Sequence, residues 1–132
     1  MIEVKVQAKP FVKWAGGKRQ LLTYFDELYP EKLKKGKIKK YIEPFVGGGA
    51  VFFDLVSKYD FEEIILNDIN NVLMSTYFVI KHDVERLISE LEELQNRFLE
   101  KEMEEREDFY YQIRTLYNEL KGNIEFENEE TE

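Results

Sequence analysis

The residues that point most directly to chemistry in this sequence are three consecutive glycines, Gly47–Gly49. They follow a β-like run with an acidic residue and a proline, Tyr41–Val46, and an apolar helical pattern begins at Ala50. Glycine lets the backbone turn tightly and approach a ligand without a Cβ atom in the way. The free N–H groups at the start of the following helix favour an anionic group. The pattern is typical of a loop that binds a nucleotide cofactor.

A second acidic residue lies about twenty residues beyond this loop, the spacing seen in nucleotide-binding α/β folds. Asp68 follows the apolar run Ile64–Leu66, so we expect it at the tip of a second strand. A carboxylate in that place holds the ribose hydroxyls in such folds. Asp68 could instead be the N-cap of a helix that begins near Asn70.

The glycine loop does not match the two commonest nucleotide motifs. Phe52 stands where the dinucleotide motif has its third glycine, which disfavours NAD. The block Trp14–Lys18 is not a phosphate-binding Walker loop, because Val12 replaces its first glycine and Arg19 its Ser or Thr. ATP is therefore disfavoured, and a plain NAD- or ATP-binding fold is kept as an alternative.

Three blocks of the sequence together resemble the Dam-type DNA adenine-N6 methyltransferases. They are Lys13–Lys18 (KWAGGK), Glu43–Phe52 (EPFVGGGAVF) and Asn67–Asn70 (NDIN), in the order and at the spacing of that family. The resemblance implies S-adenosylmethionine as the cofactor. It also implies methyl transfer to adenine N6 in duplex DNA, as in restriction-modification systems.

The resemblance implies roles for individual residues. Trp14 offers an aromatic face to the sulfonium, Lys18 suits the cofactor carboxylate, Asp68 suits the ribose diol, and Lys13 matches a position that contacts DNA. The residues expected to bind the cofactor are Trp14, Ala15, Gly16, Gly17, Lys18, Glu43, Pro44, Phe45, Val46, Gly47, Gly49, Asp68 and Ile69. Judged without the family, Trp14 could be a core residue and Lys13 an ordinary solvated lysine.

The sequence departs from the family where the chemistry should occur. The family uses an Asp-Pro-Pro-Tyr block, because the adenine amine is a poor nucleophile that needs hydrogen-bond acceptors and an aromatic face for the flipped base. The three prolines here precede Phe11, Glu31 and Phe45, so the block is absent, as is the expected DNA-recognition segment. We expect no catalytic residue in this chain, weak cofactor binding and no activity by itself. The alternative is a non-enzymatic interaction module or a partner subunit of a split methyltransferase.

The elements expected to position these residues alternate helices and strands. The patterns predict a helix over 21–29 ended by Pro30, strands over 38–43 and 63–67, helices over 50–58 and 70–81, and a possible strand at Ile2, Val4 and Val6. This order implies parallel strands joined by right-handed crossovers. The fold class is therefore α/β, a partial Rossmann-like methyltransferase fold with a C-terminal helical segment.

Three regions are expected along the chain. Residues 1–82 form the α/β cofactor-binding portion, residues 83–122 an amphipathic helical segment, and residues 123–132 a charged, disordered tail. The apolar spacing in 83–122 fits two helices or one long bent helix. In folds of this type the catalytic strand lies beside the first strand, so 38–43 is expected to be an unpaired apolar edge that self-association or a complementing chain covers.

Charge and composition set the remaining bounds. The net charge is −8, yet residues 1–40 hold eleven Lys and Arg against four Asp and Glu. A basic first third on an acidic chain is expected when one face meets a polyanion such as duplex DNA, although Lys32–Lys40 could equally be a solvated loop. The absence of cysteine excludes disulfides and thiolate zinc sites, and no metal is expected. No apolar run is long enough for a membrane span and no secretion signal is visible, so a cytoplasmic protein is expected.

Overall fold

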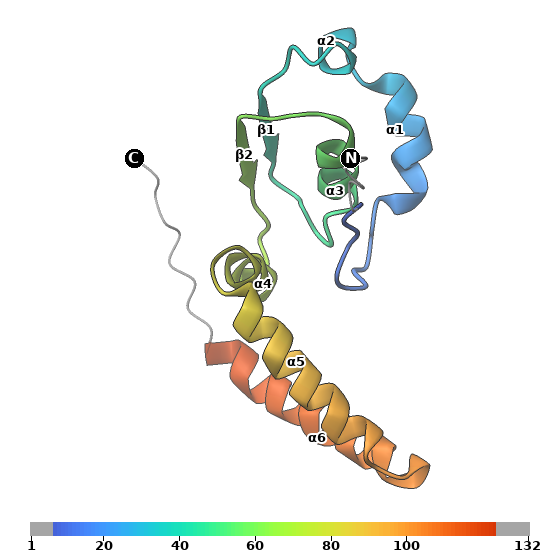
Figure 1. Ribbon diagram of the computed structural model, residues 1–132, viewed down its shortest axis with the longest axis vertical. Helices are drawn as coiled ribbons and strands as arrows, with labels where there is room; N and C mark the ends of the chain where they lie inside the picture. The colour runs from blue at the N-terminus through green and yellow to red at the C-terminus, as the bar shows by residue number, and fades with distance from the viewer. Residues whose placement is uncertain (1–6, 124–132) are drawn as a thin grey trace, which may run out of the picture. The chain divides into compact units, whose positions relative to one another are not determined.

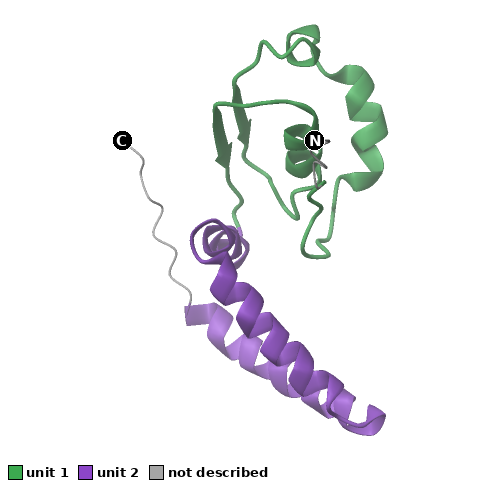
Figure 2. Cartoon of the chain, in the orientation of Figure 1, with its two compact units in different colours: residues 1–69 green, residues 70–132 purple. Residues whose placement is uncertain are grey.

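The computed structural model describes residues 7–123 of the chain (Figure 1). The strand expected at Ile2–Val6 lies outside these residues, as does the expected tail apart from Asn123. Contacts divide the chain after Ile69 into two compact units (Figure 2). This division assigns residues 70–82 to the second unit, whereas the sequence analysis grouped them with the cofactor-binding portion.

The first unit is built around two parallel strands. β1 (Lys40–Glu43) pairs with β2 (Glu63–Leu66) in a register that runs from Lys40 opposite Glu63 to Glu43 opposite Leu66. Helix α3 (Ala50–Lys58) lies between them in sequence, with the bounds that the apolar pattern predicts. The predicted parallel pairing is confirmed, and the α/β class holds as a mixture of helices with a small parallel sheet. Because the strands run in one direction, the loops after Glu43 and Leu66 leave the sheet at the same edge.

Helix α1 (Leu22–Leu28), which follows a 3-10 turn at Arg19–Leu21, packs against α3. The Lys58 ammonium joins the two helices, because it donates hydrogen bonds to carboxylate oxygens of Asp26 in α1 and Asp54 in α3, both at 3.1 Å. The segment before α1 also contacts α3, since the Phe11 ring meets the edge of Phe53 with 6.4 Å between centroids. These contacts hold the N-terminal loop beside the start of α3.

A short helix that the sequence analysis missed, α2 (Glu31–Lys34), follows α1. Pro30 begins it: φ is −65°, and the Pro30 carbonyl accepts hydrogen bonds from the N–H groups of Leu33 and Lys34. Proline suits a helix start because its φ is preset and its missing N–H has no intrahelical partner there. Leu33 is buried and anchors the turn. The stretch Lys32–Lys40 is therefore solvent-exposed at its lysines, but it is loop only over 35–39, because Lys32–Lys34 belong to α2 and Lys40 begins β1.

The second unit is helical. It contains α4 (Asn71–His82), α5 (Val84–Leu99), α6 (Met103–Leu120) and a final 3-10 turn at Lys121–Asn123. The segment 84–120 is thus two helices, broken at Glu100–Glu102, and not one bent helix. The rings of Phe98 and Phe109 meet across this break at 6.3 Å, and the Arg106 guanidinium lies over Phe98. No helix within residues 7–123 is long and apolar enough to cross a membrane.

Candidate functional site

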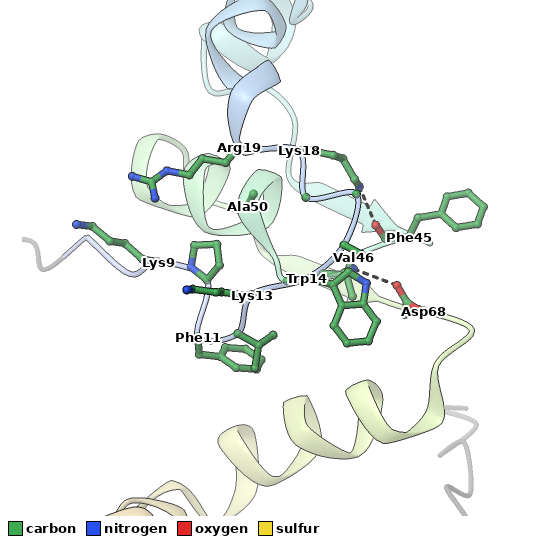
Figure 3. Close-up of a pocket in the computed structure, with 17 residues that line it drawn as sticks. Lys9, Phe11, Lys13, Trp14, Lys18, Arg19, Phe45, Val46, Ala50 and Asp68 are labelled. Atoms are coloured by element: carbon green, nitrogen blue, oxygen red, sulfur yellow. Dashed lines mark hydrogen bonds between the residues drawn. The ribbon is translucent and has the colours of Figure 1, made fainter. Parts of the chain in front are cut away.

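A cavity of about 560 Å³ lies in the first unit (Figure 3). Three segments form its walls: the loop Lys9–Arg19, the glycine loop after β1, and Asp68 after β2. The parallel strands bring the last two together, because both loops start at the same sheet edge. The first segment reaches them by packing along the glycine loop.

The glycine loop is closed onto the end of β2 by two hydrogen bonds. The Val46 N–H donates to the Asn67 carbonyl, and the Gly47 N–H donates to Oδ2 of Asp68, both at 3.0 Å. Val46 is buried between these two anchors. Asp68 therefore acts on the loop, and the alternative that it caps the next helix is excluded: the Asn70 side chain caps α4 by accepting from the Leu73 N–H at 3.0 Å.

The glycines are required by contacts within the protein. Gly47 has φ +53° and Gly49, the N-cap of α3, has φ +86°. A Cβ at Gly47 would stand 3.2 Å from Cδ1 of Trp14, and one at Gly48 would stand 3.3 Å from the Val12 carbonyl. The sequence analysis attributed these glycines to close approach of a ligand. The structure shows that Gly47 and Gly48 first allow the loop Lys9–Arg19 to approach.

Trp14 lies in the cavity wall, with one edge of its indole against Gly47 and 38% of the residue exposed. Figure 3 shows Trp14 near Asp68, on the other side of the cavity from Lys9, Lys13 and Arg19. Within the described residues none of these three cations forms an ion pair with a carboxylate, unlike Lys18, Lys40 and Lys58. The cavity thus has a cationic side and an aromatic side that carries a carboxylate.

Lys18 is held by groups of the protein. Its ammonium forms an ion pair with Oε1 of Glu43 at 2.8 Å and donates to the Phe45 carbonyl at 2.7 Å. The other oxygen of Glu43 accepts a hydrogen bond from the Tyr41 hydroxyl. Burial raises the pKa of Tyr41 above its ordinary value of 10.0, and the bond to the Glu43 carboxylate raises it further.

The structure gathers most of the predicted site residues around one cavity. Those that line it are Lys13, Trp14, Ala15, Gly16, Gly17, Lys18, Phe45, Val46, Gly47 and Asp68. Four predicted cofactor contacts do not: Glu43 and Pro44 line a second hollow, Gly49 starts α3, and Ile69 is 94% exposed. The lining residues that the sequence analysis did not name are Lys9, Pro10, Phe11, Val12, Arg19, Gly48 and Ala50. Most of these adjoin the KWAGGK block, so extending that block in both directions would have found them.

The profile of the D12 class N6 adenine-specific DNA methyltransferases matches residues 14–131. The chain belongs to this family. The D12 match begins at Trp14, so it covers every cavity residue from Trp14 to Asp68 and all of the second unit that the structure describes.

Curated relatives agree with the D12 assignment. The type II methyltransferase M.MjaIII of Methanocaldococcus jannaschii is 52% identical over 120 residues, which are 91% of this chain and 42% of the relative. The DNA adenine methylase of Haemophilus influenzae is 38% identical over 89 residues, 67% of this chain and 28% of its own length. The chain therefore spans less than half of either relative. No solved structure matches it.

Proposed function

We propose that this chain is the S-adenosylmethionine-binding portion of an enzyme that methylates adenine N6 in duplex DNA. One observation carries the proposal beyond family membership. Residues of all three family-like blocks, Trp14 and Lys18, Gly47, and Asp68, line a single cavity. The finer fold that we propose with it is a Rossmann-like methyltransferase domain, of which β1, β2 and α3 are part.

The cavity fits this cofactor in size and in chemistry. About 560 Å³ lies within the range of small-molecule sites. The cofactor supplies an electrophilic methyl group on a sulfonium, together with an amino-acid end and an adenosine. The Trp14 ring offers its face to a cation, the Lys18 ammonium suits the carboxylate, and the Asp68 carboxylate suits the ribose diol.

Cofactor binding is tested with the intact chain by titration calorimetry. Trp14 is the one tryptophan of the sequence, so its fluorescence reports on the cavity wall in the same experiment. We expect S-adenosylmethionine to bind, to change the Trp14 emission and to raise the melting temperature, whereas NAD and ATP should do none of these. Equal stabilisation by NAD or ATP would favour the plain nucleotide-binding alternative and contradict the proposal.

We propose that the cationic side of the cavity meets DNA. Lys13 was expected there from the family resemblance, and Lys9 and Arg19 lie on the same side (Figure 3). Among the described residues these three cations have no carboxylate partner, so their charges are available to an anion. The DNA backbone offers the matching negative charge.

These 132 residues contain no Asp-Pro-Pro-Tyr sequence, so we propose that they transfer no methyl group by themselves. The test incubates the purified chain with radiolabelled cofactor and adenine-containing duplex DNA. Methyl incorporation above that of a no-protein control would overturn the inactivity proposal. It would leave the cofactor proposal intact.

A second candidate role, as an interaction module, is favoured by the exposed apolar surface at β1. Within residues 7–123 β1 pairs only with β2, and Ile42 is 56% exposed. We propose that a second copy of the chain covers this edge, because unpaired strand edges template pairing. Light scattering should report a dimer that Ile42→Lys dissociates and that Leu28→Lys, a matched change on exposed α1 surface, leaves intact. A strictly monomeric wild-type chain at micromolar concentrations would contradict self-association.

A further inference from the structure

The Lys18 side chain lies between two hollows of the first unit. It lines the main cavity and also a smaller one of about 360 Å³, whose other walls are mostly apolar. Glu43 and Tyr41 line only the smaller hollow. Lys18 is therefore the one cation, among those that line the main cavity, that also lines the smaller hollow, and Glu43 stands behind it.

Every polar group behind Lys18 is engaged. Glu43 is 6% exposed, with one carboxylate oxygen on the Lys18 ammonium and the other on the Tyr41 hydroxyl. The ammonium also holds the Phe45 carbonyl at 2.7 Å, which joins it to the glycine loop. Of its three N–H groups, one has no partner within the described residues. The arrangement therefore fixes the position of the ammonium and leaves one donor for a ligand.

This ion pair differs from an ordinary surface pair in the same sheet. Lys40 and Glu63 pair across β1 and β2 at 2.9 Å, but both side chains are 53% exposed, where water screens their charges. The Glu43 carboxylate is buried, and a buried charge is costly to leave without its partner. Water therefore screens the Glu43 charge little, and that charge acts on Lys18 and on a ligand in the main cavity.

We propose that Glu43, held by Tyr41, is a positioning residue that places the Lys18 ammonium and cancels its charge, so that the cavity accepts a cationic methyl donor. The inference rests on the proposed function. S-adenosylmethionine carries a sulfonium cation, whereas its demethylated product S-adenosylhomocysteine is a neutral thioether with the same amino-acid end. Without the opposite charge of Glu43, the Lys18 ammonium would lower the affinity for the cationic donor but not the affinity for the neutral product. Glu43 thereby decides the preference between them without touching either.

The test compares the dissociation constants of donor and product by calorimetry with the full chain. In Glu43→Gln we expect the ratio of donor to product dissociation constants to rise about tenfold, the order expected for two charges across a cavity at a protein surface. In Lys18→Met the ratio should fall, because the Glu43 carboxylate then has no cation between it and the donor. The double variant Lys18→Met/Glu43→Gln should return the ratio to that of the wild type. In both proteins the side chains at positions 18 and 43 together carry no net charge.

Two controls separate this role from general loss of structure. Tyr41→Phe keeps both charges, so donor and product should weaken together and their ratio should stay within about twofold. Glu63→Gln removes the same charge from the exposed pair on the sheet and should change neither constant. A variant that only destabilises the fold would weaken both ligands equally and would leave the ratio unmoved.

The outcomes distinguish the inference from the function on which it rests. If wild-type protein binds neither ligand, the proposed function fails and the inference with it. If wild-type protein binds both but the ratio is unchanged in Glu43→Gln and in Lys18→Met, the inference alone is overturned. If Glu43→Gln fails to fold, as judged by circular dichroism, the inference is still tested by Lys18→Met. In that variant the ratio of dissociation constants should shift in the opposite direction.

Discussion

The Asp68 carboxylate accepts a hydrogen bond from the Gly47 N–H at 3.0 Å, across 21 residues of sequence. The bond joins the loops that follow the two parallel strands, so it stabilises the wall of the cavity where the strands end. A loop whose backbone is fixed in this way is preorganised for a ligand. Asp68 thus has a structural role in the loop in addition to the ribose contact that we propose for it.

Asp68→Ala should therefore weaken cofactor binding and destabilise the first unit. Loss of a hydrogen bond to a charged group costs about 1.5–3 kcal/mol, which urea unfolding measures. Asn70→Ala is the matched control, because it removes the cap of α4 at about 1 kcal/mol and Asn70 lines neither hollow of the first unit. Equal cofactor affinity in Asp68→Ala and wild type would show that neither the loop bond nor a ribose contact matters.

Gly47→Ala should cost more than the same change at Gly36. Both glycines have positive φ, +53° and +66°, so both variants suffer the left-handed backbone penalty of roughly 1 kcal/mol. Only at Gly47 does the added Cβ meet a neighbour, Cδ1 of Trp14 at 3.2 Å, whereas at Gly36 nothing lies within 4 Å. We expect Gly47→Ala alone to shift the Trp14 emission. Identical unfolding midpoints and spectra for the two variants would contradict the contact.

Stability should decline at alkaline pH partly through Tyr41. Its pKa is raised by burial and by the Glu43 carboxylate, so the folded state retains the proton more tightly than the unfolded state. The resulting stabilisation is fully present below pH 10.0 and is lost as pH rises above it, by at most about 1.4 kcal/mol per pH unit for one proton. Burial raises the pKa of Tyr29 as well. For Lys58, burial lowers the pKa, but the hydrogen bonds to Asp26 and Asp54 have the larger combined effect and raise it.

The Tyr41 contribution can be isolated by substitution. Tyr41→Phe should flatten the alkaline decline of the unfolding free energy, whereas Tyr24→Phe, at an exposed position of α1, should leave it unchanged. Tyrosinate absorbance during the titration reports when the hydroxyl ionises. A decline equally steep in wild type and Tyr41→Phe would show that this hydroxyl does not contribute.

Replacement of the cationic side of the cavity should reduce the salt dependence of DNA binding. Each phosphate contact contributes about −0.9 to the slope of log affinity against log salt concentration. The triple variant Lys9→Gln, Lys13→Gln, Arg19→Gln should thus flatten that slope by up to about 3 units in anisotropy titrations with duplex DNA. Lys40→Gln removes a cation that is paired with Glu63 and should have little effect. A slope unchanged in the triple variant would remove these residues from the proposed DNA surface.

Local features of the sequence predicted much of the fold. The apolar spacing that predicts α3 is a property of nine consecutive residues, and the structure has those bounds. The same reasoning failed at α2, because four residues are too few to show a helical period and Pro30 was taken only as an end. It also left open whether α5 and α6 are one helix or two, since the capping pair Glu102 and Glu105 lies within a stretch rich in acidic residues, where neither stands out.

The sequence by itself determined the family, through residues in three short blocks, and with it the expected cofactor and most of the residues around the cavity. Only the tertiary structure decided what those residues contact. Lys18 meets Glu43 across 25 residues and Gly47 meets Trp14, because parallel strands and the packed N-terminal loop bring distant segments together. Side-chain type and spacing do not encode such partners. The structure for this reason placed Glu43 behind Lys18 instead of in the cavity wall, and made Asn70 the helix cap in place of Asp68.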